Sequence, residues 1–122
     1  MGERRRLLYV LASGPEAPER VYAPFLLATS AAAMGVEATI YLLGDGVTVL
    51  KAGEAERMQS GSLPPLSLVI ERAAEAGVRM ELCEDSCLQR GLDSRDFIAD
   101  AKIVGASTLN DRILEADGVL SL

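Results

Sequence analysis

The sequence contains no histidine and no tryptophan, and it has only two cysteines and two lysines. The absence of histidine excludes Ser-His-Asp and Cys-His catalytic centres. It also removes the most common metal ligand and the only side chain that ordinarily titrates near neutral pH. If the protein is an enzyme, its nucleophile must therefore be activated in another way.

The sequence also lacks long basic and long apolar stretches. Its formal net charge is −6, and only Arg4, Arg5 and Arg6 form a basic run, which we interpret as a solvated flank of the first strand. Nucleic-acid binding needs clustered Lys and Arg, so no direct nucleic-acid partner is expected. No apolar run reaches the ~20 residues that span a bilayer, and the N-terminus does not resemble a signal peptide. We expect a cytoplasmic protein without a membrane partner.

Length and composition indicate one folded domain. The chain has 122 residues, of which 49% are hydrophobic and 25% are charged. This composition is typical of globular proteins and differs from the low hydrophobicity and high charge of disordered chains. Because single domains typically contain roughly 100 to 150 residues, we expect residues 1–122 to form one domain around one apolar core.

Apolar runs alternate with helix-like segments along the chain. The predicted strands lie within residues 5–14, 36–46, 78–83, 101–105 and 118–122, and the predicted longer helices within residues 18–35, 66–77 and 107–116. Shorter helices are predicted within 47–59 and 94–100, and Pro24 should either begin the first helix or kink it. The alternation predicts an α/β fold, a three-layer α/β/α sandwich on a mostly parallel five-stranded sheet.

The segment FLLATSAAAM, residues 25–34, is apolar or small on every side. A helix with one side in water usually carries polar residues on that side. We therefore expect a second element or another subunit to cover its outer face, and we favour a homo-oligomer.

The two cysteines, Cys83 and Cys87, lie in the segment MELCEDSCLQRG, where a strand-like run gives way to a helix-like one. Alternation along the strand places Cys83 on the polar face, at the carboxyl end, where open α/β sheets bind ligands. Asp85 and Ser86 can cap the following helix, so backbone N–H groups near the sulfur would stabilise a thiolate. Neighbouring carboxylates oppose this effect, and residue type alone does not decide the sign of the pKa shift.

Other roles for the two cysteines also fit the sequence. A disulfide is awkward, because side chains at positions i and i+4 of a helix have Cβ atoms about 5 to 6 Å apart, whereas a bridge needs about 3.5 to 4.5 Å. Two thiolates without histidine do not complete a four-ligand zinc site unless subunits share it, so neither a metal nor a cofactor is expected. The cysteines could also simply pack as small apolar residues.

Two turns are predicted at the same edge of the sheet as Cys83. Ser13 and Gly14 follow the first strand, and Asp45 and Gly46 follow the second. Together with Ser86 they are expected to line a pocket beside the thiol, although all of these residue types are also common in plain turns. Neither turn is a phosphate-binding loop, because the sequence has no GxxxxGK[ST] or GxGxxG motif.

The segment CEDSCLQRGL and the ending IVGASTLNDRILEADGVLSL resemble the DsrE/DsrF-like family, which includes the small TusD-like sulfur-relay proteins. The resemblance covers nearly the whole chain. It consists of a cysteine eight residues before a glycine, matched by Cys83 and Gly91, and of a terminal pattern matched by Thr108, Leu109, Ala116, Asp117 and Val119.

The resemblance implies a cytoplasmic α/β protein that assembles as a homotrimer or homohexamer. It also implies that Cys83 carries sulfur as a persulfide between a sulfur donor protein and an acceptor protein. Some relatives instead have a cysteine four residues before the glycine, where Cys87 lies, so either thiol could lead. The alternatives are a non-catalytic oligomeric binding or scaffold protein with structural cysteines and, ranked last, a thiol peroxidase.

Overall fold

The computed structural model describes residues 4–122. Its strands are β1 (Arg6–Leu11), β2 (Glu37–Leu42), β3 (Arg79–Cys83), β4 (Ala101–Val104) and β5 (Gly118–Ser121). Its α-helices are α1 (Pro18–Ala33), α2 (Leu66–Glu75), α3 (Glu84–Gln89) and α4 (Ala106–Glu115). Three 3-10 segments, η1 (Gly44–Leu50), η2 (Ala55–Arg57) and η3 (Ser94–Asp96), complete the described part of the chain.

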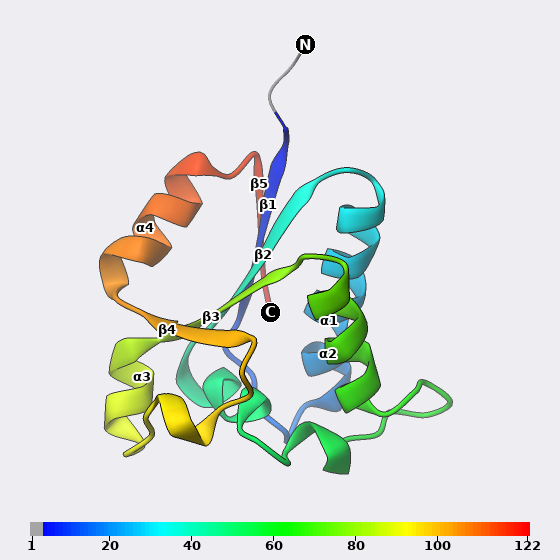
Figure 1. The fold of residues 1–122 in the computed structure, drawn as a ribbon, viewed down its shortest axis with the longest axis vertical. Helices are drawn as coiled ribbons and strands as arrows, with labels where there is room; N and C mark the ends of the chain where they lie inside the picture. The colour runs from blue at the N-terminus through cyan, green and yellow to red at the C-terminus, as the bar shows by residue number, and fades with distance from the viewer. Residues whose placement is uncertain (1–3) are drawn as a thin grey trace.

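The five strands form one sheet in the order β4-β3-β2-β1-β5, and every neighbouring pair is parallel. Helices α1 and α2 cover one face of the sheet, α4 lies over the other face, and α3 follows the carboxyl end of β3 (Figure 1). The chain steps from β1 to β4 in one direction and then returns across the sheet to β5. Because parallel crossovers are right-handed, this reversal places α4 on the opposite face from α1 and α2.

The predicted three-layer α/β/α fold is therefore confirmed, and the sheet is parallel throughout. The first three residues of the predicted domain 1–122 lie outside the described residues. In the part of the chain that the structure describes, no helix combines the length and apolarity needed to cross a bilayer.

The core lies between the sheet and the helices α1 and α2. It contains alternate residues of the central strands and the inner faces of both helices, including Tyr9, Leu11, Phe25, Ile40, Leu42, Val69, Met80 and Leu82. Burying one large apolar side chain is worth about 1.5 to 3 kcal/mol, so this face dominates the stability of the fold. Alternation along β3 sends Met80 and Leu82 into this core and directs Glu81 and Cys83 to the opposite face.

A buried ion pair attaches α4 to that opposite face. The guanidinium of Arg112 donates two hydrogen bonds, of 2.9 and 2.8 Å, to the carboxylate of Glu81. Glu81 is 3% exposed, so the pair satisfies a charge that would otherwise be costly to bury.

The predicted shorter elements differ in detail from the structure. Helix α1 begins at Pro18 and continues through Pro24, so Pro24 does not begin it. Proline at the first helical position is favourable, since the N–H it lacks would have no intrahelical partner there. The segments predicted as short helices at 47–59 and 94–100 contain only 3-10 turns. In the second segment, Asp93 and Asp96 form a reciprocal capping box, which closes a single turn.

Candidate functional site

Cys83 is the last residue of β3 and also the N-cap of α3. Its side chain is half-buried and lies on the face of the sheet opposite the core. The backbone N–H of Ser86 donates a hydrogen bond to the Cys83 sulfur at 3.4 Å. This contact forms because the first N–H groups of a helix have no intrahelical partner and turn toward the capping side chain.

Ser86 contributes its hydroxyl as well as its amide. Its Oγ accepts a hydrogen bond of 2.8 Å from the backbone N–H of Gly44, which leaves the hydroxyl proton to donate to the Cys83 sulfur. Gly44 begins η1 with a positive φ of 57°, a backbone conformation that glycine adopts without strain. The turn after β2 thereby orients the Ser86 hydroxyl on the first turn of α3.

Tyr41 is the third donor to the sulfur. It lies on β2, opposite Glu81 in the parallel register with β3, and only 1% of it is exposed. Hydrogen bonding by its hydroxyl stabilises the thiolate form of Cys83 and so lowers the pKa of that thiol. Burial raises the pKa of Tyr41, and the hydrogen bond to Cys83 and the negative charges of Cys83, Glu81 and Asp85 raise it further. The phenol therefore keeps its proton and remains a donor.

These contacts lower the pKa of the Cys83 thiol. Burial alone raises it, but the hydroxyl and amide of Ser86, the Tyr41 hydroxyl and the Asp85 amide together outweigh that effect by stabilising the thiolate. Cys87 behaves in the opposite way. It is 1% exposed and packs in the apolar core, and burial, followed by the charge on Cys83, raises the pKa of its thiol.

An ion pair links the turn after β2 to α3. The guanidinium of Arg90 donates to the Asp45 carboxylate at 2.8 Å and to the Ser86 carbonyl at 3.2 Å. Asp45, in the turn after the second strand, is thus linked through Arg90 to Ser86. The pair also closes the C-terminal side of α3 against η1.

The other predicted pocket residues lie at the same edge with different surroundings. Gly14 is buried directly against Asp45, where a side chain would meet the Asp45 backbone. Gly46 is buried against the backbone carbonyl of Leu11. Ser13 follows β1 and is half-buried. Of the five predicted residues, Ser86 alone has a hydrogen bond to the Cys83 sulfur among the contacts of residues 4–122.

Sequence reasoning missed Tyr41 and Gly44. Alternation along residues 37–42 separates Tyr41 from the core residues Ile40 and Leu42, and this signal could have marked it as facing the other side. That pattern does not predict which strand lies beside β2. Within residues 4–122, no group of three or more Cys, Asp or Glu side chains is arranged to hold a metal ion.

Comparison with known proteins assigns the fold to a family. The model of the DsrE/DsrF-like family matches residues 5–122. The chain belongs to this family. The matched residues include all five strands of the sheet and Cys83 at the end of β3.

The relatives are similar in sequence but carry no described activity. Uncharacterized protein MJ0760 of Methanocaldococcus jannaschii is 29% identical over 102 residues, which cover 84% of this chain and 37% of that protein. The chain thus spans little more than a third of that relative. Uncharacterized protein MJ0989 of the same organism is 29% identical over 112 residues, covering 92% of this chain and 95% of that protein.

A solved structure shares the fold of this DsrE/DsrF-like chain. The crystal structure of the ychN protein from E. coli superimposes with a TM-score of 0.80 and 20% sequence identity, covering 98% of this chain and all of that one. At this identity the likeness shows the fold alone.

Proposed function

We propose that the protein is a small sulfur carrier of the sulfurtransferase type, which holds sulfur as a persulfide on Cys83 and passes it to a partner protein. The observation that carries the proposal is the set of donors around one half-buried sulfur at the carboxyl edge of the sheet. A thiolate is the nucleophilic form of cysteine, and a lowered pKa raises its population at neutral pH. Membership of the DsrE/DsrF-like family supports the same function.

The reaction needs two exchange steps. The Cys83 thiolate attacks the outer sulfur of a donor persulfide, the donor S–S bond breaks, and the donor leaves as a thiolate while Cys83 becomes a persulfide. An acceptor thiolate then attacks the outer sulfur of the Cys83 persulfide, so the acceptor gains the sulfur and the Cys83 thiolate is restored. Neither step needs a histidine base, because each attacking group is a thiolate, and the lowered pKa of Cys83 raises the population of that form.

Cys83, and not Cys87, is the leading thiol in this proposal. Cys87 is buried in the core and its pKa is raised, so an external persulfide reaches it only when α3 moves. Cys87 has a secondary role in which its thiolate attacks the inner sulfur of the Cys83 persulfide. That step forms a Cys83–Cys87 disulfide and releases hydrosulfide, and it is slow because α3 must first open.

The test is sulfur loading of the full chain. Wild type, Cys83→Ser and Cys87→Ala are incubated with excess cysteine persulfide, and intact masses are then measured. Wild type and Cys87→Ala should gain one sulfur atom, and Cys83→Ser should gain none. The sulfur should remain longer on Cys87→Ala, because the resolving thiol is gone. Absence of sulfur on wild type, together with ordinary alkylation of Cys83, would favour the alternative of a non-catalytic scaffold.

Donor and acceptor proteins would dock at the carboxyl edge of the sheet, and the chain itself would form a homotrimer or homohexamer in the cytoplasm. Support for self-association comes from exposed apolar residues on neighbouring elements. Leu26 and Leu27 on α1 are 41% and 43% exposed, and Val119 and Leu120 on the edge strand β5 are 49% and 42% exposed. Apolar residues on an unpaired edge strand favour association. Light scattering after gel filtration should show a trimer or hexamer that Val119→Glu dissociates; a monomeric wild type would contradict this part of the proposal.

A further inference from the structure

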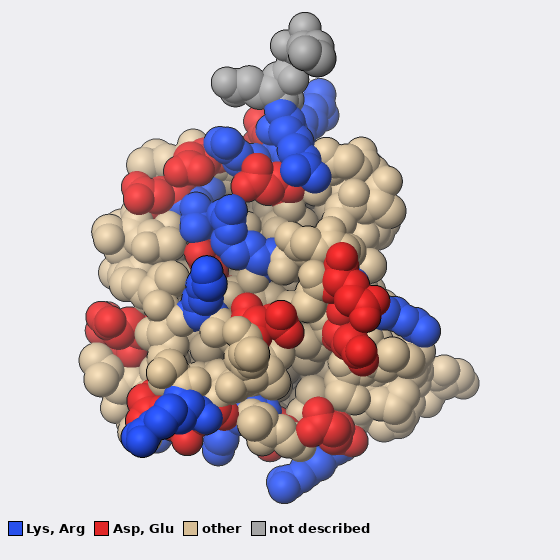
Figure 2. Space-filling view, viewed as in Figure 1, with Lys and Arg blue, Asp and Glu red and all other residues tan. Residues whose placement is uncertain are grey.

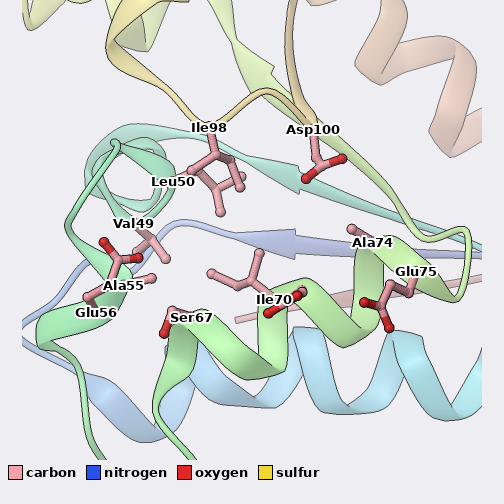
Figure 3. A pocket seen from close by; sticks show the side chains of 11 residues that line it. Val49, Leu50, Ala55, Glu56, Ser67, Ile70, Ala74, Glu75, Ile98 and Asp100 are labelled. Atoms are coloured by element: carbon pink, nitrogen blue, oxygen red, sulfur yellow. The ribbon is translucent and has the colours of Figure 1, made fainter.

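A cavity of about 340 Å³ lies on the α2 side of the molecule, among α2, the η1 and η2 segments, and the residues before β4. Figure 3 shows its centre lined by apolar side chains from these elements, with Ile70 of α2 facing Leu50 and Ile98. None of these lining residues belongs to the group around Cys83. The cavity is therefore a separate feature of the fold.

Carboxylates stand at both ends of this apolar centre. Figure 3 places Glu56 at one end and Glu75 with Asp100 at the other. Glu71 lines the cavity as well, one helical turn before Glu75. No lysine or arginine is among the lining residues.

These four carboxylates are exposed and have no cationic partner among the salt bridges of residues 4–122. Acidic side chains also gather over α2 in the space-filling view (Figure 2). Elsewhere on the described surface, acidic residues such as Glu37, Asp45 and Asp93 pair with arginines. The cavity is thus an apolar surface set in uncompensated negative charge.

We propose that this cavity binds an aliphatic diamine or polyamine. Charged and apolar groups alternate along such a ligand, and carboxylates flank an apolar centre in the cavity in the same order. Methylene segments of the ligand would cover Ile70, Leu50 and Ile98, and ammonium groups at its ends would reach the carboxylates of Glu56 at one end and Glu75 and Asp100 at the other. A monoamine satisfies only one end of the cavity, and a neutral diol satisfies neither.

The strength of such binding should depend on salt. Ion pairs with exposed carboxylates are individually weak, and they are screened when the Debye length falls to about 10 Å at 0.1 M ionic strength. The apolar contact is not screened in this way. Binding should therefore weaken with added salt without disappearing.

The experiment is calorimetric titration of the full chain with spermidine at low ionic strength. The double variant Glu75→Gln/Asp100→Asn removes two charges at one end of the cavity and keeps the side-chain shapes. The matched control Glu19→Gln/Asp111→Asn removes two exposed charges on α1 and α4, away from the cavity. Ala74→Leu fills part of the cavity and leaves every charge in place.

Spermidine should bind wild type, and its affinity should fall at least about tenfold in the cavity double variant and in Ala74→Leu. The control double variant should stay within about twofold of wild type. Cys83→Ser should bind as wild type does, so the result is independent of sulfur transfer. The proposal is overturned if the two double variants weaken binding equally, if n-hexylamine binds as tightly as spermidine, or if spermidine does not bind.

Discussion

Arg112 on α4 meets Glu81 on β3 through two hydrogen bonds, and this pair joins the C-terminal helix to the strand that ends at Cys83. The two residues are 31 positions apart in the sequence. None of the α4 side chains is fully buried. The helix thus depends on this polar contact more than on apolar packing.

Arg112→Met should destabilise the protein by about 3 kcal/mol, because it leaves the Glu81 carboxylate buried without a partner. The methionine keeps most of the aliphatic contact, so the loss of stability measures the effect of removing the guanidinium charge. Urea denaturation followed by circular dichroism measures the change. Arg95→Met is the control, since Arg95 pairs with Asp93 entirely at the surface, and its denaturation midpoint should stay at the wild-type value. Equal shifts of the denaturation midpoint in both variants would show that the buried pair contributes no more to stability than the exposed one.

The rates at which Cys83 and Cys87 are alkylated should depend differently on pH. The pKa of Cys83 is lowered and that of Cys87 is raised. Alkylation of Cys83 by iodoacetamide should reach half its maximal rate below pH ~8.5, the ordinary value for a thiol. Cys87 should react only after unfolding in urea. Peptide mass spectrometry of samples alkylated at several pH values resolves the two sites, and a Cys83 midpoint at or above the ordinary value would contradict the assignment.

The same shift predicts how stability varies with pH. A thiol whose pKa is lower in the folded than in the unfolded chain stabilises the fold fully above the unfolded pKa, and the contribution is lost as pH falls through the folded pKa. The stability of wild type relative to Cys83→Ser should therefore grow as pH rises from the folded pKa of Cys83 to about 8.5. Urea denaturation of both proteins across this range, under reducing conditions, checks the sign. A difference that shrinks with rising pH would be inconsistent with a stabilised thiolate.

Tyr41→Phe should slow the alkylation of Cys83 at pH 7 by several-fold, because a donor to the thiolate is lost and the pKa of Cys83 rises. The ring and its packing remain, so the fold should persist. Tyr9→Phe is the matched control: Tyr9 is also a buried strand tyrosine, but it faces the core on the other side of the sheet. The alkylation rate of Tyr9→Phe should equal that of wild type. If both variants behave alike, the Tyr41 hydroxyl does not act on the sulfur.

Gly46→Ala should destabilise the fold by about 1 to 3 kcal/mol. A Cβ at this position would lie 2.3 Å from the backbone oxygen of Leu11, and a backbone atom cannot move aside as a flexible side chain can. Gly105→Ala is the comparison, because a Cβ there meets nothing within 4 Å. Thermal denaturation should show a lower melting temperature for Gly46→Ala and the wild-type melting temperature for Gly105→Ala. Unchanged melting of Gly46→Ala would mean that the turn after β2 relaxes freely.

The position of Cys83 was predictable because the relevant pattern is local. Alternation along residues 78–83 separates the core residues Met80 and Leu82 from Cys83, and the polar residues after it favour a helix start. Both inferences depend only on the period of two in a strand and on helix capping. The predicted caps Asp85 and Ser86 were wrong, because the helix begins at Glu84 and Cys83 itself is its N-cap. The strand and helix types of the longer segments follow from equally local periodicities.

The donors around the sulfur were harder to predict from the sequence. Tyr41 contacts Cys83 because β2 lies beside β3, and the order of strands in a sheet depends on crossovers between distant segments. The difference in burial between the thiols was equally hidden, since Cys83 and Cys87 differ little in local sequence. Packing buries Cys87 in the core and leaves Cys83 half-buried at the strand end.

The sequence by itself determined the α/β architecture and the strand end that carries Cys83, because hydrophobic period and capping act over a few neighbouring residues. Only the tertiary structure decided which groups lower the pKa of the Cys83 thiol, which pair holds α4, and which carboxylates surround the cavity beside α2. These depend on contacts between residues far apart in the chain, where free energy is set by distance and burial, not by residue order.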